Sequence, residues 1–250
     1  MTVSPGGVKT ATAYAPNALA INTSSYYNDR GWFTVVGEIQ NTGDVALADV
    51  TVLIEIRDSQ GRTTKLTDTP QFPYSSSGVL EVGERIPFRC GSGLSLEWGP
   101  YTYAIEGVTY KIVEGKPLVL TIDTVSEYMD QSGFLHLTGY VENTSPSGFG
   151  AIGVRVTATF YGSDGVVVAV GTTTLQDFLP RNGGRGFFDV RVDDYDRRQI
   201  PLIQTWKLYA SSIEYNMVPE FPSAFIALSA TFSIGLCVIS ALRKRTKSSS

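Results

Sequence analysis

The sequence predicts an all-β protein: two tandem β-sandwich domains, residues 17–114 and 116–217, followed by one C-terminal transmembrane helix. Three observations carry this prediction. One pattern occurs twice at a spacing of about 102 residues. Apolar and polar residues alternate in short runs that Gly, Pro and Asn separate, as in β-sandwiches. An uncharged run near the C-terminus has the length that a membrane-spanning helix needs.

The duplicated pattern starts at a strand. Its two copies are WFTVVGEIQNT at residues 32–42 and FLHLTGYVENT at residues 134–144. A repeat of this length exceeds a solenoid unit and is typical of a whole sandwich domain. The sequence therefore indicates a tandem duplication with a boundary near Gly115. Gly37 and Gly139 occupy the same position of the pattern, where a strand glycine usually marks a bulge or the close approach of a backbone or bulky ring.

The next strand of each copy alternates as a half-buried strand does. Its apolar positions are Val50, Val52, Ile54 and Ile56 in the first copy and Val154, Val156, Ala158 and Phe160 in the second. We expect one face of each strand to pack and the other to contact solvent. Asp164-Gly165 then favours a type I′ hairpin turn. Turn-and-strand stretches at residues 82–88 and 179–188 complete the copies.

Residues 223–242 have the composition of a membrane anchor. They carry no charge, and about 20 residues at about 1.5 Å rise cover the roughly 30 Å of a bilayer's hydrocarbon core. The cytoplasmic tail, residues 243–250, has four stop-transfer residues: Arg243, Lys244, Arg245 and Lys247. A basic flank marks the cytoplasmic side, so we expect both sandwiches outside the cell. The alternatives are a buried core helix and a cytoplasmic-facing tail anchor.

A short motif lies directly before this span, at residues 218–222. The order of motif, apolar span and basic cluster resembles the PEF-type C-terminal sorting signals of archaeal surface proteins, which are similar to the substrates of exosortase-like transpeptidases. The resemblance covers about the last 32 residues. It implies a sorting motif made of Pro219, Glu220, Phe221 and Pro222. It also implies a sorting transpeptidase as partner; the alternative is a juxtamembrane spacer and a retained span.

The two copies also resemble a known sandwich. Gly-x-(Val/Ile)-x-Asn-Thr, a strand ending at Phe160-Tyr161, Asp-Gly, and Leu-Pro with a Gly-rich turn are similar to the FxLYD-type extracellular domain. The resemblance covers most of residues 130–192 and, more loosely, 30–90, and it departs at Gly162, where the family motif has Asp. It implies an immunoglobulin-like fold in an extracellular setting. Such domains share no catalytic residues, so no substrate follows.

Charge excludes one class of partner. Of 20 Lys and Arg, four lie beyond the span, so the part before it has 16 basic and 24 acidic residues, a net charge of −8. Nucleic-acid binding needs a basic face, so we expect no nucleic acid as a partner.

Residues 1–16, which we expect to be a flexible segment, lack the apolar run of a signal peptide. We therefore expect that an upstream signal was removed or lies outside this reading frame.

A search for catalytic chemistry is negative. His136 is the only histidine, and its alternation with leucines places it on the solvent face of its strand, so we expect an exposed structural residue. A histidine zinc site or catalytic triad with spare candidates cannot be assembled. Cys237 lies in the span, so Cys90 is expected to be a partly buried free thiol. The sequence thus predicts neither an enzyme nor a cofactor.

Three sets of residues are candidates for ligands. Asp193, Asp194 and Asp196 could offer oxygens to calcium, although a solvated loop neutralised by nearby arginines is favoured. Those arginines are Arg191, Arg197 and Arg198. Asn22 and Asn143 begin glycosylation sequons. The third set is aromatic. Its members could form a platform on which sugars stack, or they could be ordinary strand and core residues. They are Tyr26, Tyr27, Trp32, Trp98, Tyr101 and Tyr103.

Together these features predict a non-catalytic cell-surface or envelope protein, anchored through its tail. Its sandwiches would serve structural or interaction roles, with the membrane, other envelope proteins or glycans as partners. Two alternatives remain: an accessory single-pass subunit of a membrane complex, and a surface glycan-binding module.

Overall fold

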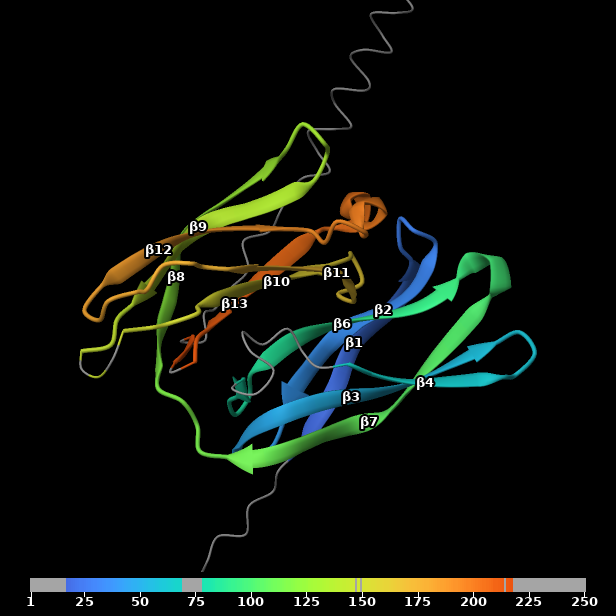
Figure 1. The fold of residues 1–250 in the computed structure, drawn as a ribbon, viewed down its shortest axis with the longest axis horizontal. Coiled ribbons are helices and arrows are strands. Elements are labelled where there is room, and N and C mark those ends of the chain that lie inside the picture. Colours follow the sequence, from blue (N-terminus) through green and yellow to red (C-terminus); the bar gives the residue numbers. More distant parts are fainter. Residues whose placement is uncertain (1–16, 69–77, 147, 149, 214, 218–250) are drawn as a thin grey trace, which may run out of the picture.

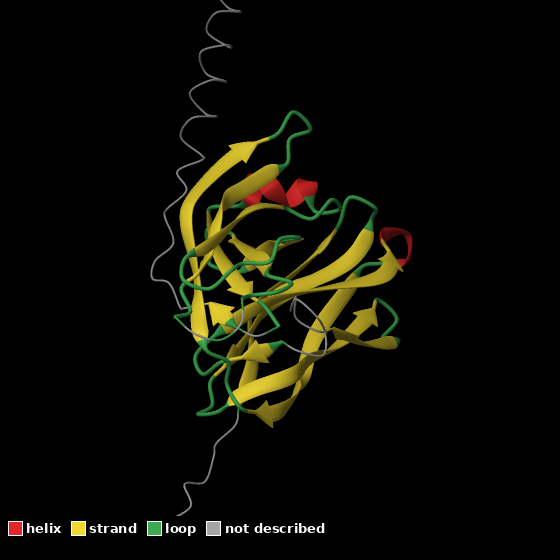
Figure 2. Cartoon of the chain, turned by 60° about the vertical axis from the view of Figure 1, so that its left-hand side comes forward, coloured by secondary structure: helices red, strands yellow, loops and turns green. Residues whose placement is uncertain are grey.

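The computed structural model describes residues 17–68, 78–146, 148, 150–213 and 215–217 (Figure 1). These residues form strands β1 to β14 and two short 3-10 helices, which confirms the all-β prediction (Figure 2). The predicted segments 1–16, 218–222, 223–242 and 243–250 lie outside the described residues. Among the residues that are described, no helix is long and apolar enough to cross a bilayer.

The first half contains two antiparallel sheets. One has the order β1 (Ala18–Tyr27), β2 (Trp32–Asn41), β6 (Arg85–Ser95). In the other, β3 (Ala46–Asp58) pairs with β4 (Thr63–Asp68), β5 (Val79–Leu80) and β7 (Tyr101–Val113). The helix η1 (Leu96–Trp98) connects β6 to β7. Side chains between these sheets form one core, which includes Ile39, Ile54 and Phe88.

The second half is one seven-stranded sheet that folds over its own core. Its order starts with β11 (Val167–Thr174), β10 (Arg155–Tyr161) and β13 (Thr205–Ser211), and ends with β8 (Leu118–Met129), β9 (Leu135–Asn143) and β12 (Gly184–Arg191). The short strand β14 (Asn216–Met217) joins the two parts, because it pairs with both β13 and β8. The helix η2 (Arg197–Leu202) precedes β13.

Both halves repeat the same order of strands. The row β1-β2-β6 corresponds to β8-β9-β12, and the row β4-β3-β7 corresponds to β11-β10-β13. Among the described strands, none of the first half pairs with one of the second. This is the repetition that the tandem duplication expected from the sequence would produce, and each half pairs its strands within itself.

The matching glycines each face a phenylalanine ring. Gly37 of β2 lies opposite Phe88, and Gly139 of β9 lies opposite Phe188. A Cβ atom on Gly37 would lie 2.8 Å from the ring of Phe88, and one on Gly139 would lie 2.8 Å from the ring of Phe188. The predicted close approach of a bulky ring is therefore present in both copies. Because each ring is buried, it has no room to move away.

The matching asparagines hold the turn that follows. Asn41 and Asn143 are fully buried. The Asn41 side chain donates to the Leu80 carbonyl at 3.0 Å, and the Asn143 side chain donates to the Leu179 carbonyl at 3.2 Å. Each side-chain oxygen accepts a backbone N–H two residues later. In the folded domain, the Asn143 amide is buried and hydrogen-bonded.

One expectation for β10 is wrong. The alternation predicted a solvent-facing side, but Val156 to Tyr161 are buried on both faces. In β3 the matching face is only partly buried, as predicted for a half-buried strand. The difference has a physical cause: the outer face of β10 is covered at Tyr161, which contacts the first half of the chain. Tyr161, at the end of β10, thus belongs to an interface between the two halves.

Candidate functional site

The two halves meet through the outer faces of their sheets. Strand β11 lies against β1 and β2 (Figure 1). A small apolar cluster forms there, of Val36, Tyr161, Val167 and Val170, with Tyr26 packed against it. The hydroxyl of Ser24 donates to the Val167 carbonyl at its side. The cluster therefore combines buried apolar side chains from both halves.

A buried carboxylate of the first half accepts hydrogen bonds at this cluster. Glu38 is 2% exposed, and its Oε1 accepts the hydroxyl of Tyr161 at 2.5 Å. Burial, together with the nearby charge of Glu38, raises the pKa of Tyr161, so the phenol stays a donor. The other oxygen of Glu38 accepts the side-chain amide of Asn22 at 2.8 Å. The amides of both predicted glycan acceptors, Asn22 and Asn143, therefore make hydrogen bonds inside the fold.

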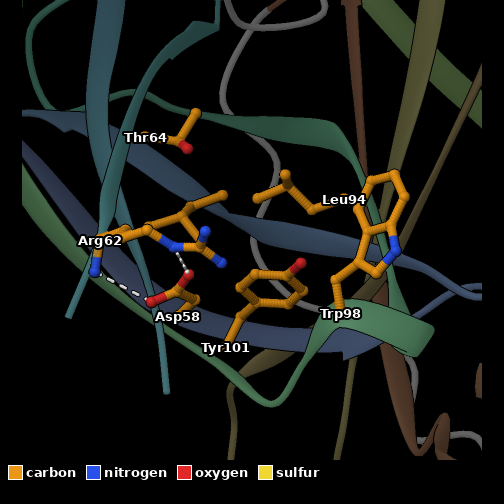
Figure 3. Close-up of a pocket in the computed structure, with 7 residues that line it drawn as sticks. Asp58, Arg62, Thr64, Leu94, Trp98 and Tyr101 are labelled. Atoms are coloured by element: carbon orange, nitrogen blue, oxygen red, sulfur yellow. Dashed lines mark hydrogen bonds and ion pairs between the residues drawn. The ribbon is translucent and has the colours of Figure 1, made fainter. Parts of the chain in front are cut away.

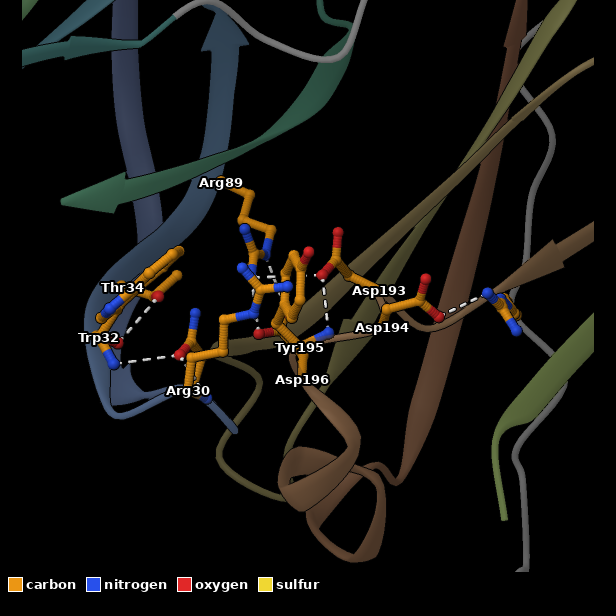
Figure 4. Close-up of polar contacts among 10 residues, drawn as sticks. Arg30, Trp32, Thr34, Arg89, Asp193, Asp194, Tyr195 and Asp196 are labelled. Carbon is orange, nitrogen blue, oxygen red and sulfur yellow. Dashed lines mark hydrogen bonds and ion pairs between the residues drawn. The ribbon is translucent and has the colours of Figure 1, made fainter. Parts of the chain in front are cut away.

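An ion pair between the halves lies beside Tyr26, which packs against this cluster. Figure 4 shows the ion pair. Arg89 of β6 donates through Nε to Asp196 Oδ2 at 2.6 Å and through Nη2 to Oδ1 at 2.9 Å. Asp196 is fully buried. Burial alone lowers the pKa of Arg89, but the contact with Asp196 outweighs it and raises that pKa above its usual value. Such a bidentate pair fixes both distance and orientation.

The rim of the interface is aromatic. The guanidinium of Arg30 lies 4.0 Å from the ring centre of Tyr195 and 5.2 Å from that of Trp32. The backbone N–H of Asp29 donates to the Tyr195 carbonyl at 2.7 Å. Figure 4 shows Arg30 and Trp32 on one side of the contact and Tyr195 on the other. Cation–π contacts of this kind add to the apolar packing behind them.

Hydrogen bonds to both halves also fix the segment that connects them, at Lys116. The backbone N–H of Lys116 donates to Glu81 of the first half, and its ammonium group donates to the Ser212 carbonyl of the second half at 3.0 Å. Tyr209 of β13 packs in the core cluster of the first half. Its hydroxyl donates to Glu84 at 3.5 Å. Burial raises the pKa of Glu84 to about 8.

The three candidate calcium ligands do not converge. Asp196 pairs with Arg89, Asp193 lies 3.3 Å from the same guanidinium, and Asp194 pairs with Arg191. No group of three or more His, Cys, Asp or Glu side chains in the described part of the chain could hold a metal ion. Of the arginines expected to neutralise the loop, only Arg191 contacts one of these aspartates. Arg198 contacts Asp29, and Arg197 lies over Phe134.

His136 contradicts its predicted exposure. It is 8% exposed, because Tyr128 stacks on the ring at 4.6 Å between ring centres and two carboxylates flank it. Its Nδ1 lies 2.7 Å from Asp189 and its Nε2 lies 3.4 Å from Asp130. Backbone donation from Phe134 lowers the pKa of Asp130. The neighbouring strands β8 and β12 bring this cover to the histidine, and its hydrogen-bond partners include no serine or cysteine.

Cys90 is a buried free thiol rather than a partly buried one. It is 5% exposed, and burial with the nearby charge of Asp68 raises its pKa to about 12. A nucleophilic cysteine needs an accessible thiolate near neutral pH. The environment of Cys90 therefore favours a structural role in the core over a role as a nucleophile. Cys237 lies outside the described residues.

The candidate aromatics do not form one platform. Tyr26 packs at the interface, and Trp32 lies at its rim. Tyr27, Tyr101 and Tyr103 pack against the core of the first half. Trp98 is different, because the residue is 65% exposed. It lines a pocket of about 490 Å³ together with Ile56, Asp58, Arg62, Thr64, Leu94 and Tyr101 (Figure 3).

Comparison with known proteins assigns no family. No family model matches the sequence, and no curated protein matches it. Among solved structures, the chain is similar to a transglutaminase from red sea bream, with 10% sequence identity and a TM-score of 0.24. The match covers 86% of this chain and 32% of the transglutaminase, so the chain spans about a third of that protein's length.

Proposed function

We propose that the chain is a non-catalytic cell-surface or envelope protein whose two β-sandwich modules act as one rigid structural or interaction unit. The observation that carries this proposal is the bidentate ion pair between Arg89 and Asp196, which joins the halves across a buried contact. Module pairs that move independently usually meet through small, wet contacts. Here the buried hydrogen bond between Tyr161 and Glu38 and the hydrogen bond from Lys116 to Glu81 both support one relative orientation of the modules.

The buried polar pairs of this interface support a fixed orientation of the two modules. Burying a charge costs free energy unless its partner is placed with good geometry. Arg89 with Asp196 and Tyr161 with Glu38 meet that condition, and each pair draws one member from each half. A mismatched orientation would bury these groups without partners. The polar pairs therefore select one arrangement, while the apolar cluster between them supplies attraction.

The external setting rests on the sequence. The acidic part before residue 218 suits an exposed soluble surface, and the uncharged stretch 223–242 with its basic flank suits an anchor. The motif at residues 219–222 suits a sorting transpeptidase as the partner that processes this anchor. In this proposal the sandwich pair stands outside the cell, where the modules contact other envelope proteins or glycans.

Protease treatment of intact cells of the native host tests the setting. We expect an added protease to degrade the chain or release fragments of residues 17–217 without lysis, while a cytoplasmic marker protein stays intact. A chain that is protected in intact cells and cut only after lysis would place the modules inside and overturn the proposal.

A further inference from the structure

We propose that the pocket beside Trp98 binds a carboxylate-bearing sugar, such as a uronic acid unit of a surface glycan. The site gives the proposed contact with glycans a location and a ligand class, and it does not depend on how the chain is anchored. Its volume of about 490 Å³ lies in the range of small-molecule pockets, which is roughly 300–1,000 Å³. Its walls combine two aromatic side chains with a few polar groups, as ligand sites do (Figure 3).

Local geometry explains why Trp98 stands in the open. The helix η1 that carries it is capped by Ser95, whose hydroxyl accepts the backbone N–H of Glu97 at 3.3 Å. The backbone N–H of Gly99 then closes the turn on the Leu96 carbonyl. This short turn holds the indole at the mouth of the pocket, 65% exposed and outside the core. A large exposed aromatic beside a pocket is typical of a binding surface.

The aromatic walls suit a sugar ring. The faces of Trp98 and Tyr101 carry negative π density, which attracts the slightly positive C–H groups on the face of a pyranose. Tyr101 is held in place because its ring packs on Phe33 at 5.7 Å between centres. The exposed indole and the packed phenol therefore offer two aromatic contact surfaces for a sugar ring.

The polar wall provides mainly donors. Asp58 accepts the backbone N–H of Arg62 at 2.9 Å and its side-chain Nε at 2.6 Å. The backbone bond closes the turn, and the Nε bond ties the guanidinium to Asp58. The terminal nitrogens of the guanidinium point toward Tyr101 in Figure 3. Those nitrogens have no hydrogen-bond partner among the described residues, and the hydroxyl of Thr64 lies on the same wall. A guanidinium fork with free terminal N–H groups matches a carboxylate bidentately.

Charge balance favours a sugar acid over a simple anion. Asp58 offsets the charge of Arg62, so attraction for a bare ion is weak at this exposed site. A ligand gains most when a carboxylate on the Arg62 side is linked to a ring on the Trp98 side. A neutral sugar would fill only the second position, and a small carboxylate only the first. We expect a weak site, with a Kd on the order of 1 mM for one sugar unit.

The test uses the detergent-solubilised full chain and the indole N–H signals of its three tryptophans, Trp32, Trp98 and Trp206, in NMR spectra. Titration with methyl glucuronide to ~50 mM should shift the Trp98 signal along a saturating curve. Trp32 and Trp206 lie outside the pocket, so their signals should not move. Methyl glucoside and acetate, which each lack one half of the ligand, should bind at least ~10-fold more weakly.

Variants separate the two walls. Arg62→Gln should weaken glucuronide binding by ~10-fold and leave the response to methyl glucoside unchanged. Phe187→Ala, which truncates an exposed aromatic of the other half, serves as the matched control and should bind like wild type. An unmoved Trp98 signal in the wild-type chain would overturn the site, and this measurement needs no variant. Equal binding of glucoside or acetate, or of an acidic peptide, would overturn the ligand class; the proposed surface role would stand in either case.

Discussion

Arg89 and Asp196 lie 107 residues apart in the chain and form a bidentate ion pair between the two halves. The carboxylate is fully buried, while its neighbour Asp194 pairs with Arg191 in solvent. One loop thus contains a buried and an exposed ion pair. Their comparison tests how much the interface contributes to stability.

Asp196→Ala should lower the free energy of unfolding by about 3 kcal/mol, because it removes the buried bidentate partner of Arg89 and leaves only the longer contact with Asp193. Asp194→Ala, which removes the exposed pair of the same loop, should cost at most about 1 kcal/mol. Urea denaturation of the two variants beside wild type measures both values. Equal, small losses would show that the buried pair does not join the halves.

Gly37→Val and Gly139→Val should each destabilise the chain by roughly 1 to 3 kcal/mol through overpacking against Phe88 or Phe188. Gly107→Val is the matched control, because Gly107 also lies in a strand and a Cβ atom there meets nothing within 4 Å. Denaturation midpoints give the comparison. If the control variant loses as much as the other two, strand context rather than the facing ring explains the glycines.

Glu84 should make stability depend on pH. Its pKa rises from 4.5 to about 8 on folding, so the folded chain favours the protonated carboxyl, and this contribution is full below about pH 4.5 and lost as the pH rises through 8. Glu84→Gln imitates the protonated form and should remove this loss. The stability difference between variant and wild type should therefore grow in favour of the variant across that window.

The exposed Glu97→Gln variant controls for general charge effects in the same titration of stability. Its difference from wild type should stay flat between pH 4.5 and 8. A flat curve for Glu84→Gln as well would show that Glu84 ionises normally in the folded chain.

Glu220→Ala combined with Phe221→Ala tests the sorting motif in the native host. The span 223–242 and its basic flank remain, so insertion should persist while the uncut, full-length form accumulates in the membrane. The mass of the mature C-terminus reports cleavage directly. A double variant that matures like wild type would reduce the motif to a spacer and favour a retained single-pass subunit.

The sequence predicts more of each sandwich than of the contact between them. Matching glycines, the alternation in β3 and the Asp164-Gly165 turn all act within one copy, where periodicity reports burial directly. Thr157 and Thr159 of β10 are polar yet buried, because the fold covers a face that alternation assigns to solvent. The alternation of apolar and polar residues predicts which face of a strand packs within its own module. It does not predict which residues a second module covers.

The surroundings of the candidate site residues also differ from those that the sequence predicts, because their contacts come from distant parts of the chain. The sequence places Asp196 in an acidic cluster, but its partner Arg89 lies in the other copy, and no local pattern connects them. His136 is covered by Tyr128 and Asp189, which strand pairing brings from distant positions. The sequence does not distinguish Trp98 from the aromatic residues that pack against the core, and the fold does. Long-range pairing therefore decides which candidates meet.

Calorimetry of the full chain tests most directly whether the two sandwiches act as one unit. Because the interface buries polar pairs and an apolar cluster from both halves, we expect one cooperative transition, with calorimetric and van't Hoff enthalpies equal. Asp196→Ala should then lower its midpoint or split it into two. Two separate transitions in the wild-type chain, both unmoved by Asp196→Ala, would contradict the account.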